Sequence, residues 1–522
     1  MDAEEFDVAI VGGGPAGSTL GSLLRKYHPG LRVGIFERDS FPRDHVGESQ
    51  LPPIGKILDE MECWGRVEEA GFPIKIGATY RWGSSPDLWD FEFLPLSQFR
   101  DEERPARFVG QRQQTAFQVD RARYDQILLD QARSFGCEVW EECGVTPVLG
   151  SEDEIDHLLR PDGRQVRARY YVDASGGAAV LRRALGVPVE VPTALKNVAF
   201  WSYWQNADWA VEIGVGGTRV QVMSIGTGWI WFIPLSPTRT SVGFVCPAQH
   251  YKAAGQSPES LYLNALEQDP RIRDLMKNAV RESEVEGTKD WSFLADRAAG
   301  KNWFLAGESI GFADPILAAG MTLAQTGARE LAYILPALLQ DEADAGWLKD
   351  WYGETQRKRI RQHIRFADFW YSSNGQFTDL QAYTSEIARD AGLSLNPDKA
   401  FQWLGTGGFT NDTVGQAGIG GLDLAGLKQV TQKFTRGGLD WKLNRYNSFK
   451  LNLRNAKKAR TPVFHEGEIS SQLSYHRGTK CLVATGMYAL MLELVKTRKS
   501  AGAIYQAMIE YFRSRSDLGA SP

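Results

Sequence analysis

A glycine-rich segment near the start of the chain has the spacing of a phosphate-binding turn. It reads Gly12-Gly13-Gly14-Pro15-Ala16-Gly17 and lies between an apolar run at 6–11 and leucines at helical spacing. Glycine at the first position permits a tight turn, at the third it admits a pyrophosphate, and at the sixth it lets the helix pack on the strand. A phosphate there meets the helix N-terminus. The segment therefore predicts nucleotide contacts at Gly12, Gly14, Pro15, Ala16 and Gly17.

Glu37 extends this pattern to a strand–helix–strand unit. It follows a second apolar strand, 31–36, and stands 20 residues after Gly17, where a carboxylate could accept from a ribose hydroxyl. The order of elements requires a right-handed crossover and parallel strands. Two later strands end at polar residues of the same module: 170–172 at Asp173, and 303–305 at Gly307-Glu308. We therefore expect a nucleotide fold assembled from separated pieces of chain.

Two tryptophans and one lysine are further candidates for chemistry. Trp229 and Trp231 are two residues apart in the strand-like run 228–233, so both indoles should lie on one face and form a wall. Alternation places Lys75 on the strand face opposite its two neighbouring isoleucines. Two tryptophans in a core and a lysine on a solvated strand face would show the same spacings, so both interpretations stay open.

The elements that position these residues predict an α/β protein. The expected architecture is a Rossmann-like FAD/NAD(P)-binding domain, an inserted antiparallel β-sheet substrate domain and a mostly helical C-terminal region. The sheet is expected from aromatic and β-branched runs at 199–204, 219–225, 228–233 and 241–246. The expected boundaries are 1–75, 105–190 and 285–345 for the nucleotide domain, 76–104 and 191–284 for the sheet, and 346–522 for the helical region. A glycine-rich break at 405–421 separates off the tail.

Composition excludes several classes of function. A net charge of -5 with dispersed Lys and Arg provides no basic surface for nucleic acid. The 5 cysteines form no CxxC pair, so we expect reduced thiols and no metal site. The first apolar run follows acidic residues, unlike a signal peptide, and no apolar stretch reaches the roughly 20 residues of a membrane span. We expect a cytoplasmic protein with no nucleic-acid or membrane partner.

These motifs together resemble the glutathione-reductase type of FAD-binding fold, as found in aromatic hydroxylases, prenyl reductases and halogenases. The resemblance covers most of residues 1–345 and adds the helix start 119–125, where Arg121 would lie near the flavin. It implies FAD contacts at Asp173, Gly307, Glu308 and Asp314. The family usually has Gly-Asp where this chain has Gly307-Glu308, and the longer Glu308 alters the contact to the ribityl chain.

Within that superfamily the chain resembles the flavin-dependent halogenases. The segment 229–234 matches their W-x-W-x-I-P signature, and 47–49 resembles their Gly-Glu-Ser loop near the flavin. The resemblance implies catalytic roles for Lys75, Glu48, Trp229 and Trp231, and a flavin contact at Ser49. The loop 314–320 aligns with the halide-binding loop, whose two backbone N–H groups fall at Ala319 and Gly320.

The resemblance also implies a reaction. Reduced FAD (FADH2) from a separate flavin reductase, with O2, would convert chloride or bromide into hypohalous acid. Lys75 would pass the halogen to a small aromatic substrate. Tryptophan halogenases carry Glu and Ser where this chain has Leu317 and Ala318, which favours a phenol or pyrrole, free or tethered to a carrier protein. Such an enzyme belongs to secondary metabolism.

Three other functions share the fold. An aromatic monooxygenase would hydroxylate its substrate without halide. A prenyl or alkene reductase would consume reduced flavin without O2. A non-catalytic flavoprotein serving as an oxygen or redox sensor would bind FAD and make no use of Lys75.

We expect Gly14→Val to abolish FAD loading, because a branched side chain would occupy the space through which the pyrophosphate approaches the backbone. Flavin absorbance of the purified protein measures the loading. A yellow, fully loaded variant would contradict the assignment of the glycine turn.

Overall fold

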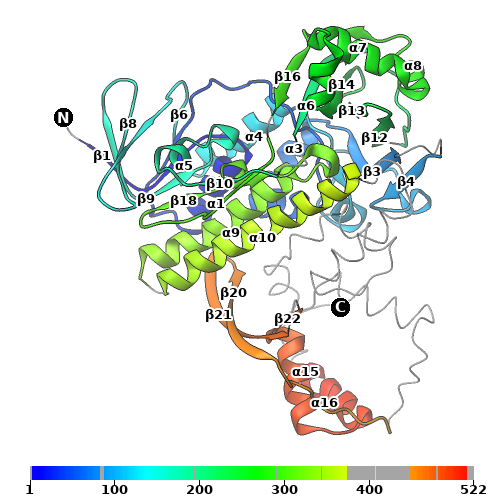
Figure 1. Cartoon of the computed structure of the whole chain (residues 1–522). Coiled ribbons are helices and arrows are strands. Elements are labelled where there is room, and N and C mark those ends of the chain that lie inside the picture. Colours follow the sequence, from blue (N-terminus) through cyan, green and yellow to red (C-terminus); the bar gives the residue numbers. More distant parts are fainter. Residues whose placement is uncertain are drawn as a thin grey trace. The chain divides into compact units, whose positions relative to one another are not determined.

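The computed structural model describes residues 3–82, 87–192, 196–214, 216–289, 291–341, 344–372, 406, 446–477 and 480–513. The chain divides into two compact units, residues 1–388 with 394–410, and residues 389–393 with 411–522. The division at 410/411 falls inside the glycine-rich segment 405–421. Figure 1 shows the elements of both units.

The nucleotide-binding sheet is built from strands far apart in the sequence. Its order is β6-β2-β1-β9-β8-β7, with β18 paired to β9. The strands are β1 (Glu4–Val11), β2 (Val33–Phe36), β6 (Glu138–Trp140), β7 (Thr146–Leu149), β8 (Ile155–Leu159), β9 (Gln165–Asp173) and β18 (Trp303–Leu305). The pairs β1–β2, β1–β9, β2–β6 and β9–β18 are parallel. The expected parallel assembly of separated strands is confirmed.

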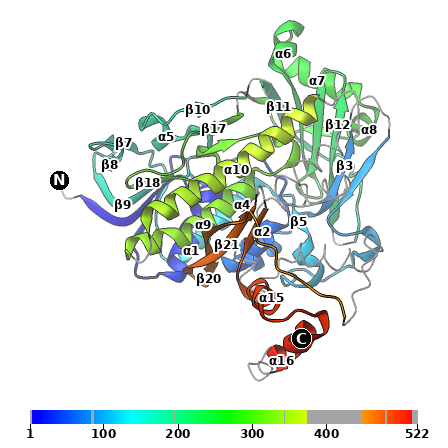
Figure 2. The same cartoon turned by 60° about the horizontal axis from the view of Figure 1, so that its bottom comes forward.

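Helices pack around this sheet. Helix α1 (Pro15–Tyr27) lies against α9 (Gly320–Leu339), and both are buried along most of their length. Figure 2 shows α9 running beside α10 (Ala345–Ser372). The shorter helices of this region are α2 (Pro53–Glu60), α3 (Trp64–Glu69), α4 (Arg121–Ser134) and α5 (Val180–Ala184), with 3-10 turns η1 (Leu96–Gln98), η2 (Gly110–Gln114), η3 (Gly176–Ala178), η4 (Gly307–Ser309) and η5 (Pro315–Leu317).

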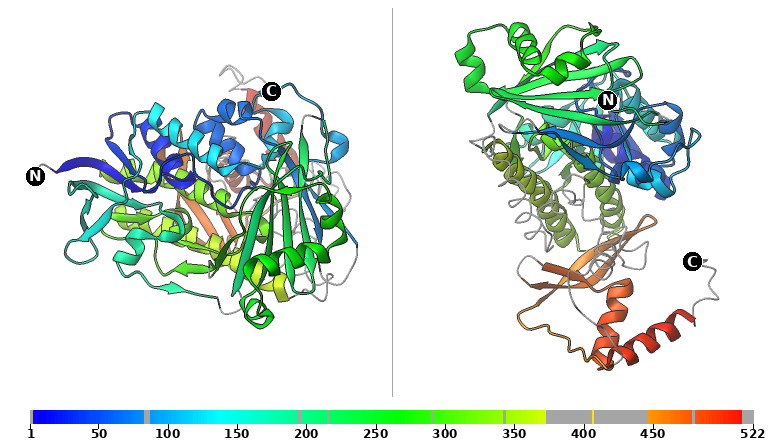
Figure 3. Two further views of the ribbon diagram at one scale, coloured as in Figure 1. Left: turned by 90° about the horizontal axis from the view of Figure 1, so that it is seen from above. Right: turned by 90° about the vertical axis from the view of Figure 1, so that its right-hand side faces the viewer.

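A second, larger sheet carries the tryptophan motif. Its order is β15-β11-β14-β13-β12-β3-β4, with β16 on β11 and β5 on β3. The strands are β3 (Ile74–Arg81), β4 (Trp89–Glu92), β5 (Ala116–Phe117), β11 (Asn197–Gln205), β12 (Gly217–Ile225), β13 (Gly228–Pro234), β14 (Arg239–Pro247), β15 (Val280–Arg281) and β16 (Glu286–Lys289). The four runs expected as an antiparallel sheet are β11 to β14, seen together in the left view of Figure 3. Strand β3 joins β12 in parallel, which sequence reasoning did not anticipate.

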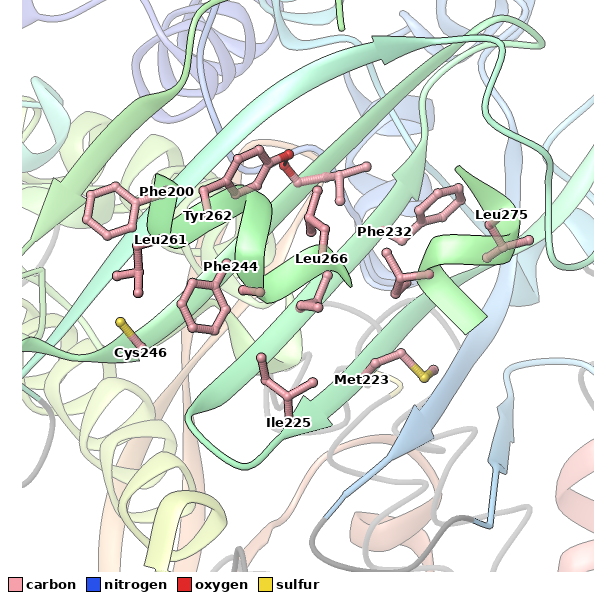
Figure 4. Packing of buried hydrophobic residues seen from close by; sticks show 14 of the residues in the cluster. Phe200, Met223, Ile225, Phe232, Phe244, Cys246, Leu261, Tyr262, Leu266 and Leu275 are labelled. Carbon is pink, nitrogen blue, oxygen red and sulfur yellow. Dashed lines mark hydrogen bonds between the residues drawn. The ribbon is translucent and has the colours of Figure 1, made fainter. Parts of the chain in front are cut away.

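One face of this sheet is a hydrophobic core. Helices α6 (Ala248–Ala254), α7 (Pro258–Gln268) and α8 (Pro270–Leu275) supply residues that belong to it or pack against it. Phe232 and Phe244 are fully buried there together with Leu266 of α7 (Figure 4). Alternation sends the odd-numbered residues of β11, β13 and β14 to the opposite face. The core therefore fixes which side chains remain for a site.

A small sheet and the C-terminal unit complete the described structure. Strands β10 (Val189–Glu190), β17 (Phe293–Ala295) and β19 (Gly311–Phe312) form the small sheet. The C-terminal unit contains β20 (Lys457–His465), β21 (Glu468–Arg477), β22 (Lys480–Val483), α15 (Gly486–Thr497) and α16 (Ala501–Arg513). The two helices lie in the segment expected to be helical. The three strands were not foreseen, because serines, glutamine and charged residues weaken the strand signal in 468–477.

The described residues show neither a membrane-spanning helix nor a cluster of metal ligands. Among the described helices, none is long and apolar enough to cross a bilayer. The described part of the chain contains no group of three or more His, Cys, Asp or Glu side chains placed to hold a metal ion. Four described cysteines, at 63, 137, 143 and 246, are buried free thiols.

We expect Phe232→Ala to lower the free energy of unfolding of the first unit by about 3–5 kcal/mol, because it leaves a cavity between β13 and the covering helices. Phe232→Leu, which keeps most of the volume, should cost about 1 kcal/mol. Chemical denaturation followed by near-ultraviolet circular dichroism measures both values. Equal losses for the two variants would contradict this packing.

Candidate functional site

The glycine turn opens on a cavity of about 580 Å³. Gly12 adopts a φ of +106°, and a Cβ there would overlap the carbonyl oxygen of Ala174, so the turn needs glycine at this position. A Cβ on Gly17 would in turn overlap the carbonyl oxygen of Gly12. The Gly13 N–H donates to Glu37 Oε2 at 2.7 Å. The turn and the end of β2 are thus joined at the cavity wall.

The structure divides the expected FAD contacts into two groups. Those that line this cavity are Gly12, Gly14, Pro15, Ala16, Glu37, Arg121 and Glu308. Residues outside its lining are Gly17, Ser49, Asp173, Gly307 and Asp314. Asp173 is fully buried and accepts from the backbone N–H groups of Ser175 and Arg182 at 3.2 and 2.9 Å. Its carboxylate therefore holds the end of β9 in shape.

The hydrogen-bond donors of Arg43 show whether this cavity suits the pyrophosphate of FAD. Its Nε and Nη1 atoms are buried and have no hydrogen-bond partner among the described residues. The guanidinium lines the cavity, and Nη2 lies 3.6 Å from the position of a Cβ on Gly14. Nearby Asp125 is an ion-pair partner at 3.7 Å. The guanidinium also lies 3.7 Å from Asp39, but neither carboxylate is within hydrogen-bond distance, so its N–H donors beside the glycine turn fit a pyrophosphate. Sequence reasoning missed Arg43, since a lone arginine in a loop gives no signal.

A second cavity, of about 770 Å³, adjoins the first. The two share six lining residues: His45, Arg121, Gly177, Glu308, Gly320 and Met321. Lys75, Glu48, Ser49, Trp229 and Trp231 all line the second cavity, as do Leu317 and Ala318. The structure therefore brings the candidate catalytic residues together beside the cofactor cavity.

Lys75 is buried in the wall of this second cavity, with 2% of its surface exposed. Its Nζ donates to the carbonyl oxygen of Gln50 at 2.9 Å and lies 5.3 Å from the centre of the Phe93 ring. Burial lowers the pKa of the amine to about 7. The interpretation of Lys75 as part of a solvated strand face is therefore wrong, because the face is covered.

A β-bulge turns Lys75 toward the cavity. The parallel pairing of β3 with β12 shifts register between Thr218 and Arg219, so that Lys75 faces Thr218 while Gly77 faces Arg219. Ile76 is the extra residue. Strict alternation would put Lys75 opposite Ala78 and Tyr80, yet all three line the cavity. The extra residue in the bulge shifts the alternation by one, so Lys75 shares a face with Ala78 and Tyr80. No pattern in the sequence predicted this bulge.

Arg121 lines both cavities, and Glu48 lines the second one. Burial raises the pKa of the Glu48 carboxyl, which accepts from the Gly47 N–H at 3.0 Å and from Tyr203 at 3.3 Å. Arg121 pairs with Asp125 at 2.7 Å and donates to the Gly47 carbonyl at 3.1 Å. The positive charge of Arg121 lowers the pKa of His45, which favours the neutral imidazole at physiological pH.

The two tryptophans form the expected wall. Their ring centres are 6.0 Å apart on one face of β13, and Trp231 donates to Ser241 at 3.1 Å. A Cβ on Gly243 of β14 would overlap the Trp231 ring, so glycine makes the space for this indole. The core interpretation accounts for their burial, but both side chains also line the cavity.

Trp229 is tied to the expected halide loop through Tyr371 of α10. The Trp229 indole donates to the Tyr371 hydroxyl at 2.7 Å, and that hydroxyl donates to Asp314 at 3.0 and 3.1 Å. Asp314 also accepts from the Ile316 N–H at 3.0 Å. The Asp314 carboxylate is bound to Tyr371 and to the backbone of its own loop, and so it does not line the cofactor cavity. Tyr371 was missed because it lies 57 residues from Asp314 in the sequence.

The loop then leads into α9. Ala318 has a φ of +55° and Ala319 is the N-cap residue, followed by Gly320 as the first residue of the helix. Alanine has no side-chain acceptor, so it leaves the first N–H groups of α9 for another partner. Gly320 lines both cavities, whereas Ala319 is buried outside their linings.

Asp314 should make stability depend on pH. Burial raises its pKa from 3.8 to about 7, so the folded protein keeps a proton that the unfolded chain releases. That contribution is fully present below about pH 4 and is lost as pH rises toward 7. The wild type should therefore lose free energy of unfolding between pH 5 and pH 7, whereas Asp314→Asn should not. Relative to the wild type, the free energy of unfolding of Asp314→Asn should rise by about 2 kcal/mol from about pH 5 to pH 7. Chemical denaturation of both proteins at pH 5 and at pH 7 measures this change. If the free energies of unfolding of variant and wild type differ by the same amount at both pH values, the prediction is wrong.

Comparisons with known proteins agree with this geometry. A family model described as Tryptophan halogenase matches residues 7–103 and 97–377. A tryptophan 2-halogenase of Chondromyces crocatus is 31% identical over 380 residues, 71% of this chain and 68% of the relative. The 1H-pyrrole-2-carbonyl-(peptidyl-carrier protein) chlorinase of Pseudomonas fluorescens is 29% identical over 391 residues, 72% of this chain and 86% of the relative.

Solved structures that are similar to this chain include flavin-dependent halogenases. CmlS, a flavin-dependent halogenase, is 25% identical with a TM-score of 0.70, covering 96% of this chain and 90% of its own. The myxobacterial chondrochloren halogenase CndH is 26% identical with a TM-score of 0.63, covering 78% and 97%. The chain therefore belongs to the tryptophan halogenase family and is a flavin-dependent halogenase, an enzyme that uses FAD.

Proposed function

We propose that Lys75 relays hypohalous acid, made from chloride or bromide, to an electron-rich aromatic substrate in the second cavity. The observation that carries this proposal is the burial of the Lys75 amine in a cavity that shares six residues with the cofactor cavity. FAD, bound in its reduced form and delivered by a separate flavin reductase, supplies with O2 the oxidising power for the halide. The protein residues hold and direct the product.

The ionisation of Lys75 supports the relay. With a pKa near 7, a large fraction of the amine is neutral at physiological pH. A neutral amine can accept a hydrogen bond from hypohalous acid, or react with it so that an N–halogen bond forms, the halogen–oxygen bond breaks and water leaves. In either form the halogen is held at Lys75 Nζ. The buried Glu48 is the carboxyl group in this cavity that we assign to catalysis.

The halide is expected at the start of α9. We place it on the backbone N–H groups of Ala319 and Gly320, where the helix provides positive potential for an anion. Gly320 lines both cavities, which supports an anion at their junction. Asp314, held by Tyr371, fixes the loop that precedes this turn.

Cofactor contacts are proposed on the same basis. Gly12, Gly14, Pro15, Ala16, Glu37, Arg121 and Glu308 would touch FAD, because they line its cavity. Gly17, Asp173 and Gly307 would act by shaping the turns that form it. Ser49 would meet the flavin from the second cavity.

Two apolar residues of the second cavity, Leu317 and Ala318, suggest the class of substrate. Leu317 and Ala318 line the cavity where a Glu and a Ser would help to orient an indole. Apolar residues there suit a phenol or pyrrole, whose ring is already electron-rich. The pyrrole chlorinase from Pseudomonas fluorescens supports this class and a carrier-tethered form of the substrate. The tryptophan 2-halogenase relative favours an indole instead, and a substrate panel separates the two.

We expect Lys75→Ala to lose at least about 100-fold in halogenated product, since a positioned catalytic group contributes that much or more. FAD loading should stay at the wild-type level, because Lys75 does not line the cofactor cavity. Product formation from a panel of phenols, pyrroles and tryptophan, with a flavin reductase and chloride or bromide, is measured by mass spectrometry.

The matched control is Lys252→Ala, which removes an exposed lysine on α6. It should halogenate as the wild type does. Retained halogenation by Lys75→Ala would remove the lysine from the mechanism, and hydroxylated product formed equally well without halide would point to the monooxygenase.

A further inference from the structure

We propose that Ser49, Gln118 and Thr218 hold ordered water against the Lys75 amine and so act as positioning residues for it. The inference rests on the proposed function of Lys75. Gln118 and Thr218 have no role in the proposed reaction, and Ser49 has there only a contact to the flavin.

Strand register places these side chains on one face with Lys75. Thr218 of β12 is the direct ladder partner of Lys75. On the other side Lys75 pairs with Ala116 of β5, and Gln118 follows two residues later, on the same face. Ser49 forms an isolated bridge with Gln118. Residues from three segments of the chain therefore surround the lysine.

These side chains are buried and unpaired. Their exposed fractions are 6% for Ser49 and 0% for Gln118 and Thr218. The hydroxyls of Ser49 and Thr218, and both side-chain polar atoms of Gln118, have no hydrogen-bond partner within the described part of the chain. Single buried groups of this kind occur elsewhere in the protein, as at Thr240. These four atoms belong to residues that strand register places beside Lys75, and buried polar atoms without a partner in the chain call for one from outside it.

Water is the partner that fits this set. Hydroxyls and a carboxamide present both donors and acceptors, so a halide alone or a cation alone would leave half of them unsatisfied. Water supplies both roles, and buried water bridges polar groups that the chain cannot pair. The Lys75 amine, which already donates to Gln50, has further N–H groups for it.

Such water would carry protons for Lys75. To become neutral the ammonium group must release a proton, and a hydrogen-bonded water can accept it and pass it on. Charged side chains on the adjoining segments are Glu48, next to Ser49 in the sequence, and Arg219, which pairs with Asp90 and Glu92 on the opposite face of β12 and β4. Burial, rather than any of these charges, lowers the pKa of the amine. We therefore expect a change in hydration to change its ionisation.

The first test is a high-resolution crystal structure of the full-length wild type with oxidised FAD bound. We expect ordered water within hydrogen-bond distance of Lys75 Nζ and of Gln118 or Thr218. If no ordered water is seen there and these side chains are hydrogen-bonded to one another instead, the proposal is wrong. This test uses the wild type and does not depend on the folding of a variant.

The second test measures the ionisation of Lys75 directly, by NMR of lysine labelled at the ε-carbon, with Lys75→Met assigning the signal. Thr218→Val and Gln118→Leu should each lower the Lys75 pKa by about one unit, because excluding water disfavours the ammonium form. Thr218→Ser, which keeps a hydroxyl, should retain the wild-type pKa.

Thr240→Val is the matched control. Thr240 is also a buried threonine with an unpaired hydroxyl, in the same sheet, but on the face that carries the hydrophobic core. It should leave the Lys75 pKa unchanged, and an unchanged pKa in both Thr218→Val and Gln118→Leu would refute the inference. These measurements need no turnover, so they separate this inference from the proposed relay, which Lys75→Ala tests.

Discussion

The burial of one amine is the constraint on which the rest of the site depends. Lys75 is enclosed by β3, its neighbouring strands and the 45–51 segment, and this enclosure brings its pKa close to neutrality. An ammonium group buried without a charged partner is costly, so the surrounding structure has to hold it firmly. The bulge in β3, the carbonyl of Gln50 and the Phe93 ring provide that support. The chemistry proposed for the enzyme follows from this environment.

The two large sheets position different parts of the site. The nucleotide-binding sheet ends in the glycine turn and in Asp173, which shape the cofactor cavity. The larger sheet buries one face against helices and keeps the other for Trp229, Trp231 and Lys75. Tyr371 then links the tryptophan wall to the loop that leads into α9.

The sequence alone determined the local features of the protein. The spacing of Gly12, Gly14 and Gly17 predicted the turn, because backbone geometry there admits little except glycine. Strand alternation predicted that Trp229 and Trp231 share a face, since that property depends only on neighbours in the chain. The motif resemblance identified the halogenase family, which the comparisons confirm.

Only the tertiary structure decided what these features contact. No pattern showed that the β3 bulge turns Lys75 into the cavity, that Arg43 stands beside Gly14, or that Tyr371 bonds to Asp314. Each of these depends on the pairing or packing of residues that are distant in sequence. Sequence periodicity reports which face a side chain occupies, whereas burial, pKa and hydrogen bonding depend on what covers that face.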